Sequence, residues 1–301
     1  MMPTGRPFTL VLGGGGARGF AHAGVLRALE REGLLPAGIV GVSMGAVVAA
    51  TYAHRDDWYR AVLSMEVSAF PGPVETDGAD ASGLLPTARK VIAHLRVLEK
   101  MVMGWGPGTG AREAGLSELR ALLRSEELDG GRLPVAVSAT DLTSGRRVVM
   151  RSGTAVDAVY ASAALAGVLP PLEAGDHLLA DGAYTDLAPV DVARSLAAGP
   201  VIAVDPGQES DAGEIHNGFQ AIMRAMEICH RQHAELRFGE ADLVLRPRFR
   251  RRIDTLDFGA RRECVAAGLR AVRAEKRAIC GLLTATAPEW LEGGEEAGRG
   301  R

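Results

Sequence analysis

The first 54 residues pass twice from a short apolar run, through a glycine-rich joint, to a helical pattern. The run 8–12 indicates a buried strand, and a helix follows over residues 18–32, with Gly33 as its C-terminal cap. A second apolar run, 39–42, leads into an alanine-rich helix over residues 44–53. Alternation of this kind predicts an α/β fold with a parallel sheet.

Glycine is concentrated where these elements join. Eleven of the 38 glycines lie in the first 45 residues, where average usage would place about three. Such crowding indicates backbone geometry rather than flexibility, because glycine permits sharp turns and close approach of other groups. The two joints are therefore the first places to search for function.

The α/β pattern is interrupted over residues 55–116, which we interpret as an insertion with a lid-like region. It contains an amphipathic helix over residues 87–103, which could pack on the sheet or a second subunit, or lie on a membrane. A second helix is expected to be capped by Ser117. Further strands are expected at 133–139, 147–150, 178–180, 201–204 and 242–245, and helices at 154–164, 190–198, 214–238 and 260–283.

These elements predict a three-layer α/β/α architecture around a mainly parallel sheet. Residues 8–205 would form the catalytic domain, and residues 206–283 a C-terminal helical extension packed on the same domain. Residues 284–301 have no hydrophobic periodicity and are expected to form a flexible tail.

Charge and cysteine content limit the partners and the compartment. Lys and Arg number 34 against 37 Asp and Glu, so no nucleic-acid partner is expected. The three cysteines have no metal-like spacing and are expected to be buried thiols of a reducing cytosol. The charge-free stretch 37–53 fits a strand and a helix better than a membrane span. We expect a cytoplasmic protein, with peripheral membrane contact left open.

The first glycine joint, Gly14-x-Gly16-x-x-Gly19, has the spacing of a dinucleotide-binding loop. That function also needs an acidic residue at the end of the second strand, to hold the ribose. Ser43 stands there instead. A dinucleotide-binding module is therefore a remote alternative, and we expect no cofactor and no metal.

The second joint, Gly41-Val42-Ser43-Met44-Gly45, has the Gly-x-Ser-x-Gly pattern of a nucleophile elbow between a strand and a helix. The sharp turn would bring side chains at Gly41 and Gly45 into collision, and the dipole of the helix would favour a developing alkoxide at Ser43. The alternative is a tight turn with an incidental serine.

The first loop then gains a role beside this serine. In a parallel sheet both loops lie at the carboxyl edge, so N–H groups of Gly14, Gly15 and Gly16 could form an oxyanion hole. Arg18 would add positive charge there, or would be a solvated arginine at the start of a helix.

The histidines are poor candidates for the base that a serine nucleophile needs. An α/β-hydrolase places its elbow deeper in the chain and its histidine late. His216, His230 and His233 share one predicted helix and are expected on its exposed face, while His22 remains an alternative base beside the glycine loop.

Asp181 is the better candidate for the base. It ends a short strand at the same edge and is followed by Gly182 and Ala183, although Asp-Gly also commonly forms turns.

These motifs together resemble the patatin-like phospholipases, of the bacterial type with a single patatin domain. The resemblance covers about residues 8–205 and rests on segments 14–19 (GGGARG), 41–46 (GVSMGA) and 181–183 (DGA), supported by 139–145 and 161–171.

The resemblance implies a serine acyl hydrolase that cleaves fatty-acyl esters of phospholipids or related lipids through an acyl-enzyme. Ser43 matches the nucleophile and Asp181 the proton acceptor of a Ser–Asp dyad; the matching oxyanion and motif positions are Gly14, Gly15, Gly16, Arg18, Gly19, Gly41, Gly45, Gly182 and Ala183. A catalytically weak lipid-binding or regulatory protein is the alternative. The expected partner is a lipid or acyl-ester substrate, with a homo-oligomer left open.

The chain departs from the family pattern in two places. Residues 183–189 lack the usual second glycine and asparagine pair, and Ala166 replaces a usual proline. These changes concern the pocket near Asp181. Outside the resemblance, residues 246–252 carry five arginines, expected to form a solvated strand and turn or, second, a headgroup or membrane-surface site.

Overall fold

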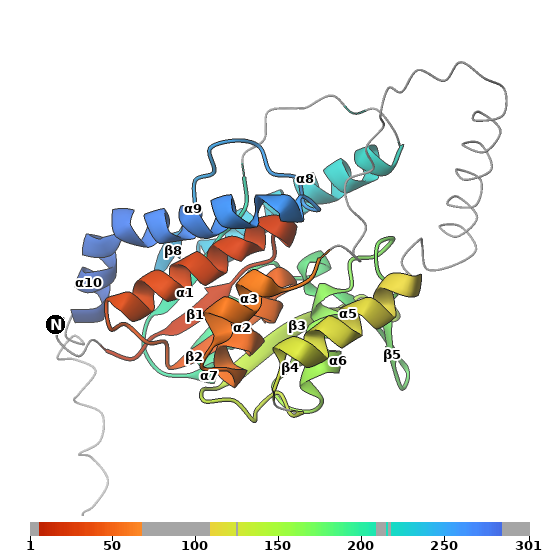
Figure 1. Cartoon of the computed structure of the whole chain (residues 1–301), viewed down its shortest axis with the longest axis horizontal. Helices are drawn as coiled ribbons and strands as arrows, with labels where there is room; N and C mark the ends of the chain where they lie inside the picture. Colours follow the sequence, from red (N-terminus) through yellow and green to blue (C-terminus); the bar gives the residue numbers. More distant parts are fainter. Residues whose placement is uncertain (1–5, 68–108, 125, 209–214, 216–217, 285–301) are drawn as a thin grey trace, which may run out of the picture.

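An eight-stranded, mostly parallel sheet forms the centre of the structure (Figure 1), a computed structural model that describes residues 6–67, 109–124, 126–208, 215 and 218–284. The strand order is β5-β6-β3-β2-β1-β7-β8, and β4 pairs with β3 beside this path. The parallel strands are β1 (Thr9–Leu12), β2 (Gly38–Val42), β3 (Val135–Asp141), β7 (Val201–Val204) and β8 (Leu243–Leu245). The antiparallel pairs involve β4 (Arg146–Met150), β5 (Leu172–Ala174) and β6 (His177–Asp181).

Helices cover both faces of the sheet, because the side chains of its strands alternate between two cores. Leu10 and Leu12 face the larger core and Val11 the smaller. The larger core is covered by α1 (Ala21–Arg31), α2 (Met44–His54), α3 (Trp58–Ser64), α5 (Thr109–Leu122), α6 (Ala155–Ala163), α9 (Arg261–Ala274) and α10 (Lys276–Thr284). The smaller is covered by α7 (Val190–Leu196) and α8 (Gly218–Phe238). The predicted three-layer α/β/α fold is confirmed.

Helices α1 and α9 lie side by side in Figure 1 and approach at two glycines. A Cβ on Gly24 would collide with the backbone of Val265, and one on Gly268 with that of Ala21. The contact brings a helix from the C-terminal third of the chain directly against the helix that follows the first glycine loop.

Three predicted helices have different bounds in the structure. The first begins as a short 3₁₀ turn, Gly16–Phe20, before α1, in which the N–H of Arg18 donates to the carbonyl of Gly15 three residues earlier. Ser117 lies inside α5 rather than at its start, since the buried stripe of that helix already includes Leu116. The last predicted helix is two helices, separated at Glu275. The expected helix over residues 87–103 and most of the expected tail lie outside the described residues.

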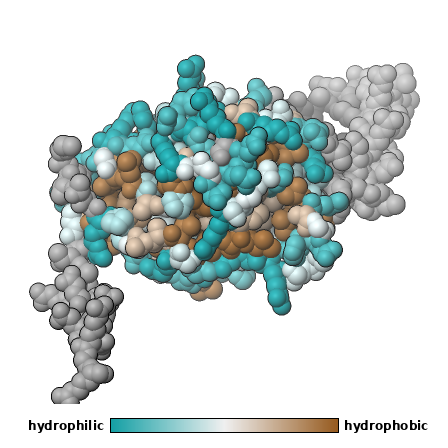
Figure 2. Space-filling model, turned by 90° about the horizontal axis from the view of Figure 1, so that it is seen from below, coloured by the Kyte–Doolittle hydropathy of each residue, from teal (hydrophilic) through white to brown (hydrophobic). Residues whose placement is uncertain are grey.

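The surface is not uniformly polar. Figure 2 shows a face on which hydrophobic residues gather across the middle and hydrophilic residues form the rim. Within the described ranges, each helix is either too short or too polar to span a lipid bilayer. The expectation of buried thiols is correct for Cys264, while Cys280 is only partly buried. It is wrong for Cys229, which is exposed on α8, because the side of that helix packed on the sheet carries Ala234 and Phe238 instead.

Candidate active site

The register of β3 explains why Ser43 and Asp181 meet. Along one edge of β3, β2 pairs up to Val42↔Ser138, and β6 continues on the same edge from Asp181↔Ala139. The other edge is occupied by β4. Since β6 is antiparallel to β3, the carboxyl ends of β2 and β6 face each other. Residues 138 positions apart in sequence are thereby placed at one point.

Ser43 lies on a strained turn, as an elbow requires. Its φ of 55° and ψ of −126° make it the single non-glycine residue with positive φ in the described chain. A Cβ on Gly41 would lie 2.6 Å from the carbonyl oxygen of Gly45, so the turn leaves no room for a side chain at Gly41. A Cβ on Gly45, however, would meet the backbone of Leu12 in the neighbouring strand. Such strain costs about 1–3 kcal/mol and is typical of functional sites.

Ser43 and Asp181 are directly hydrogen-bonded. The hydroxyl of Ser43 donates to Oδ2 of Asp181 over 2.6 Å, and the N–H of Ala183 donates to Oδ1 over 2.9 Å. The carboxyl is 3% exposed. Burial raises the pKa of Asp181 from 3.8 to about 6, against these two hydrogen bonds, which favour the ionised form. The carboxylate is thus a stronger base than an ordinary aspartate.

A second serine, which sequence reasoning missed, supports the elbow. The N–H of Ser43 donates to Oγ of Ser162 over 3.0 Å, and that hydroxyl donates to the carbonyl of Ser138 over 2.7 Å. Ser162 lies in segment 161–171, which supports the resemblance to the patatin-like phospholipases. That resemblance is the feature of the sequence that could have pointed to Ser162.

The glycine loop lies against this pair. A Cβ on Gly14 would be 3.7 Å from the Cβ of Ser43. The N–H of Gly14 donates to Leu187 over 3.3 Å and that of Ala17 to Thr255 over 2.8 Å. Within the described residues, the N–H groups of Gly15 and Gly16 donate to no protein acceptor, so these two amides are the ones that a ligand could engage.

The alternative base, His22, has a structural contact instead. It is fully buried in α1, and its Nε2–H donates to the carbonyl of Gly13 over 2.8 Å. Burial lowers the pKa of His22 to about 4, so the ring is neutral at pH 7. It anchors the start of the glycine loop.

Of the histidines expected on one exposed helix face, one differs from that expectation. His233 is exposed as predicted, and His216 lies outside the described residues. His230 is partly buried because it faces the cavity beside the ring of Tyr184, with ring centroids 5.5 Å apart. Burial lowers the pKa of His230.

A cavity of about 420 Å³ adjoins the dyad, which is within the range of small-molecule sites. The predicted residues that line it are Gly14, Gly15, Gly16, Arg18, Ser43, Asp181 and Ala183. Its apolar walls include Val47, Leu119, Val168, Leu169, Met223 and Phe258. The motif positions Gly19, Gly41, Gly45 and Gly182 are in the backbone behind it, where a Cβ would meet neighbouring atoms.

Arg18 is buried at the cavity wall rather than solvated. Its Nη1 donates to the carbonyl of Ile253 over 2.9 Å and forms an ion pair with Glu227 over 3.0 Å. The guanidinium therefore links the glycine loop to α8.

The two departures from the family pattern contact each other. Ala166, unlike proline, has an N–H, which donates to the hydroxyl of Tyr184 over 2.9 Å. Tyr184 stands in the unusual segment that follows Asp181. Near Asp181, a hydrogen bond between Ala166 and Tyr184 thus stands where a proline would restrict the backbone.

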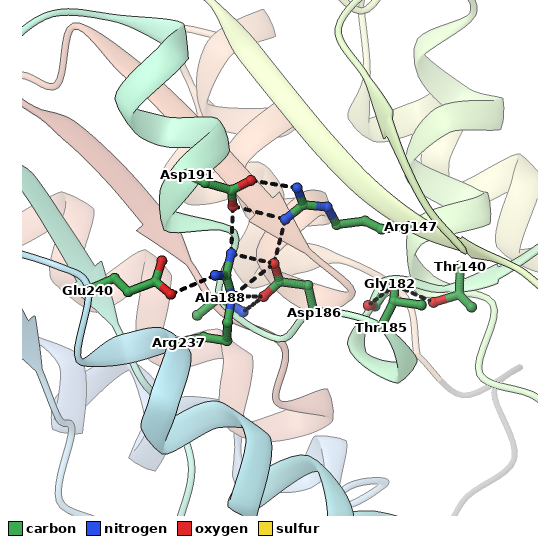
Figure 3. A network of polar contacts seen from close by, with 9 residues as sticks. All are labelled: Thr140, Arg147, Gly182, Thr185, Asp186, Ala188, Asp191, Arg237 and Glu240. Atoms are coloured by element: carbon green, nitrogen blue, oxygen red, sulfur yellow. Dashed lines mark hydrogen bonds and ion pairs between the residues drawn. The ribbon is translucent and has the colours of Figure 1, made fainter. Parts of the chain in front are cut away.

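A network of ion pairs holds the loop after Asp181 to α8 (Figure 3). Asp186, which is buried, accepts hydrogen bonds from Arg147 on β4 and Arg237 on α8, and both arginines also bind Asp191. Figure 3 shows these side chains converging from β4, α7, α8 and the loop after Asp181. The network thereby holds the next residue, Leu187, in place. The carbonyl of Leu187 accepts the hydrogen bond from the N–H of Gly14.

The arginines of residues 246–252 lie in a loop after β8, most of them paired. Arg251 binds Asp257 over 3.0 Å, and Arg252 binds Asp254 over 3.0 Å. Arg248 and Arg250 are exposed. Among the described residues, no group of three or more His, Cys, Asp or Glu is arranged to hold a metal ion.

Comparison with known proteins decides the family. A family model described as patatin-like phospholipase matches residues 10–194, more than half of the chain. This chain belongs to the patatin-like phospholipase family. It is 31% identical over 212 residues to the patatin-like phospholipase domain-containing protein 7 of Mus musculus, and 31% identical over 207 residues to the lysophospholipase NTE1 of Cryptococcus neoformans. The matches cover 70% and 69% of this chain but 14% and 12% of those relatives, so the chain spans about one-seventh of their length.

Solved structures similar to this patatin-like chain include two bacterial proteins. The crystal structure of VipD from Legionella pneumophila aligns with a TM-score of 0.49 at 15% identity, covering 92% of this chain and 67% of that one. The crystal structure of the type III effector protein ExoU aligns with a TM-score of 0.32 at 16% identity, over 91% of this chain and 53% of that one.

Proposed function

We propose that this patatin-like chain is a serine acyl hydrolase that cleaves fatty-acyl ester bonds of phospholipids or related lipids. The observation that carries the proposal is the 2.6 Å hydrogen bond from Ser43 to the buried Asp181 at an apolar cavity. A hydroxyl on a strained elbow, bonded to a base of raised pKa, is the arrangement that nucleophilic catalysis needs. Membership of a phospholipase family supports lipid esters as substrates.

In the proposed first half-reaction, Asp181 takes the proton of Ser43 while Oγ attacks the ester carbonyl carbon. The carbonyl oxygen becomes an oxyanion, which the unengaged N–H groups of Gly15 and Gly16 would stabilise. Gly14 and Arg18 belong to the same loop, and Arg18 adds positive charge at the cavity wall. The carbon–oxygen bond to the alcohol then breaks, and the alcohol leaves with the proton held by Asp181.

In the second half-reaction, water attacks the acyl-enzyme. Asp181 takes a proton from the water, the oxyanion forms again at the glycine loop, and the bond from Ser43 to the acyl carbon breaks. Ser43 recovers the proton and the fatty acid leaves. One base serves both steps, and the apolar cavity walls would hold the acyl chain.

A fluorophosphonate probe tests the proposal against a catalytically weak lipid-binding protein. The enzyme would be labelled at Ser43 in the wild type and not in Ser43→Ala, with the labelled peptide located by mass spectrometry. Absence of labelling in folded wild-type protein would instead favour the lipid-binding role. A dinucleotide titration checks the remote alternative, and we expect no binding, because Ser43 occupies the position of the ribose-binding carboxylate.

The proposed setting is the cytoplasm, with contact to a membrane surface during catalysis. Self-association is compatible with the exposed apolar residues of α8, Ile222, Ile228 and Leu236.

A further inference from the structure

The carboxylate of Asp186 holds a backbone turn and an ion-pair network at the same time. Its Oδ1 accepts the N–H of Ala188 over 3.0 Å, which closes a turn around Leu187. Its Oδ2 accepts Nη2 of Arg237 over 2.9 Å and also Nη1 of Arg147. Figure 3 shows Ala188 and both guanidiniums gathered around this carboxylate. Because the side chain of Asp186 is only 5% exposed, water cannot readily replace these contacts.

The turn around Leu187 lies directly against the first glycine loop. The carbonyl of Leu187 accepts the N–H of Gly14 over 3.3 Å. A Cβ on Gly14 would lie 2.8 Å from Cδ1 of Leu187, and a Cβ on Gly13 would lie 3.2 Å from the carbonyl oxygen of Leu187. Leu187 thus contacts the loop through both its backbone and its side chain. A shift of Leu187 would therefore move the neighbouring amides of Gly15 and Gly16, which a ligand could engage.

The same turn is joined to the segment that carries the proposed base. The N–H of Asp186 donates to the carbonyl of Gly182 over 3.0 Å, and Gly182 directly follows Asp181. Asp186 therefore connects the segment of the base with the turn that contacts the glycine loop.

Further carboxylates anchor the two arginines of the network. Nη2 of Arg237 also binds Asp191 on α7, Nη1 of Arg237 binds Glu240, and Nη2 of Arg147 binds Asp191. Arg237 lies beyond residues 10–194, which match the family model. Asp186 lies in segment 183–189, which departs from the family pattern. The network thus ties this unusual segment to a helix outside the matched region.

The position of the network relative to the cavity indicates how it can act. In the described parts of the chain, Leu187 lines the cavity, whereas Asp186, Arg147 and Arg237 do not. The charged side chains can therefore affect a reaction at Ser43 only through the backbone that they hold. Resting on the proposed function, we propose that Asp186 is a positioning residue, which aligns the oxyanion loop with Ser43 by holding Leu187.

The test measures kcat and KM for p-nitrophenyl acyl esters in wild type, Asp186→Asn and Asp57→Asn, per active site titrated with a fluorophosphonate. Asp186→Asn keeps an oxygen that can accept the N–H of Ala188 but removes the charge that binds both arginines. Asp57 is the matched control, because Arg55 and Arg124 bind it over 2.7 and 3.8 Å away from the cavity. In Asp186→Asn we expect kcat to fall about tenfold at unchanged KM, less than the roughly 10²–10³-fold for loss of an oxyanion donor. The control should keep both constants.

Two further readouts separate positioning from a merely structural role. Unfolding in urea measures the stability of each protein, and lower stability of Asp186→Asn with wild-type kcat per titrated site would overturn the inference. The pH profile of kcat should keep its midpoint and lose height, because the base itself is unchanged. A shifted midpoint with an unchanged plateau would show that Asp186 acts through Asp181 and not through the glycine loop.

Hydrogen–deuterium exchange follows the loop without catalysis. The peptide that contains Gly14 should exchange faster in Asp186→Asn than in wild type, and at the wild-type rate in Asp57→Asn. Equal exchange in all three proteins would contradict a hold on the loop through Leu187.

Variants of Arg237 keep the test decisive if Asp186→Asn does not fold. Arg237→Lys retains the charge beside Asp186 but loses the planar fork of donors, so its kcat should lie between those of wild type and Arg237→Gln. Equal kcat in these three proteins would overturn the inference. Ser43→Ala should show only background hydrolysis, and that result together with wild-type kcat in Asp186→Asn and Arg237→Gln would contradict this inference alone. Equal hydrolysis by Ser43→Ala and wild type would instead contradict the proposed function.

Discussion

At the scale of single residues, two unfavourable features face each other across one hydrogen bond. Ser43 has a φ of 55°, and Asp181 is a carboxyl buried without a cationic partner in its hydrogen bonds. Each is costly alone, and the surrounding backbone holds both in place through Ser162 and Ala183. Such residues are expected where function rather than stability has selected the geometry.

Asp181→Asn should lower hydrolysis of p-nitrophenyl acyl esters by about 10²–10⁴-fold, because the amide cannot accept the proton of Ser43. Asp176→Asn, at an exposed turn before β6, is the matched control and should keep wild-type rates. Steady-state kinetics on both variants checks this. Full activity in Asp181→Asn would show that another group is the base, and His22 would be tested next.

The raised pKa of Asp181 also predicts a dependence of stability on pH. The folded protein binds this proton more tightly than the unfolded chain, so stability falls as pH rises from about 4 to about 6. The loss corresponds to roughly 3 kcal/mol for a shift of about two units. Asp181→Asn removes this ionisation and the loss of stability that it causes. Chemical denaturation should therefore find a larger free energy of unfolding for the variant than for wild type at pH 8, and equal values near pH 3.5. An equal difference at both pH values would contradict the assigned pKa. Catalysis should rise with pH through about 6.

At the scale of elements, the sequence predicted those features that depend on a few neighbouring residues. The elbow at Ser43 and the C-terminal glycine of α1, Gly33, follow from a few neighbouring residues, and both occur. The contacts of Ser162 and the pairing of Ala166 with Tyr184 join distant segments, so no local pattern could predict them. The meeting of β2 and β6 on one edge of β3 depends on strand register, which is likewise a long-range property.

Ser162→Ala tests the link between α6 and the elbow. Removing this hydroxyl leaves the partly buried N–H of Ser43 and the carbonyl of buried Ser138 without this partner, at a cost of about 1–3 kcal/mol. We expect lower stability and a lower kcat, because the elbow is held less firmly. Ser152→Ala, at an exposed turn, is the control. Unchanged denaturation and kcat in Ser162→Ala would show that the elbow needs no such support.

At the scale of the whole molecule, the C-terminal third both braces and shapes the site. Helix α9 packs on α1 at Gly24 and Gly268, and α8 supplies part of the cavity wall. The loop between β8 and α9 also contacts the site. In this loop, the carbonyl of Thr255 accepts the N–H of Ala17 in the glycine loop, and the carbonyl of Ile253 accepts Nη1 of Arg18. We propose that residues 206–283 are therefore part of the catalytic unit rather than a separate attachment.

Gly268→Ala and Gly281→Ala test this packing with two glycines in neighbouring helices. A Cβ on Gly268 would collide with the carbonyl of Ala21, whereas one on Gly281 meets nothing within 4 Å. We expect Gly268→Ala to lose about 1–3 kcal/mol of stability by overpacking, and Gly281→Ala to gain about 0.5–1 kcal/mol from helix propensity. Thermal denaturation measures both. A neutral or stabilising Gly268→Ala would show that α9 does not pack closely on α1.

The most direct measurement for the central claim is release of fatty acid from a panel of phospholipids, lysophospholipids and neutral acylglycerols, by wild type and Ser43→Ala at pH 8. The dyad geometry predicts release from at least one lipid class by the wild type and only background release by Ser43→Ala, with both proteins equally folded by circular dichroism. Equal release by the two proteins would contradict the role of Ser43, and no release from any lipid by folded wild type would contradict the acyl hydrolase.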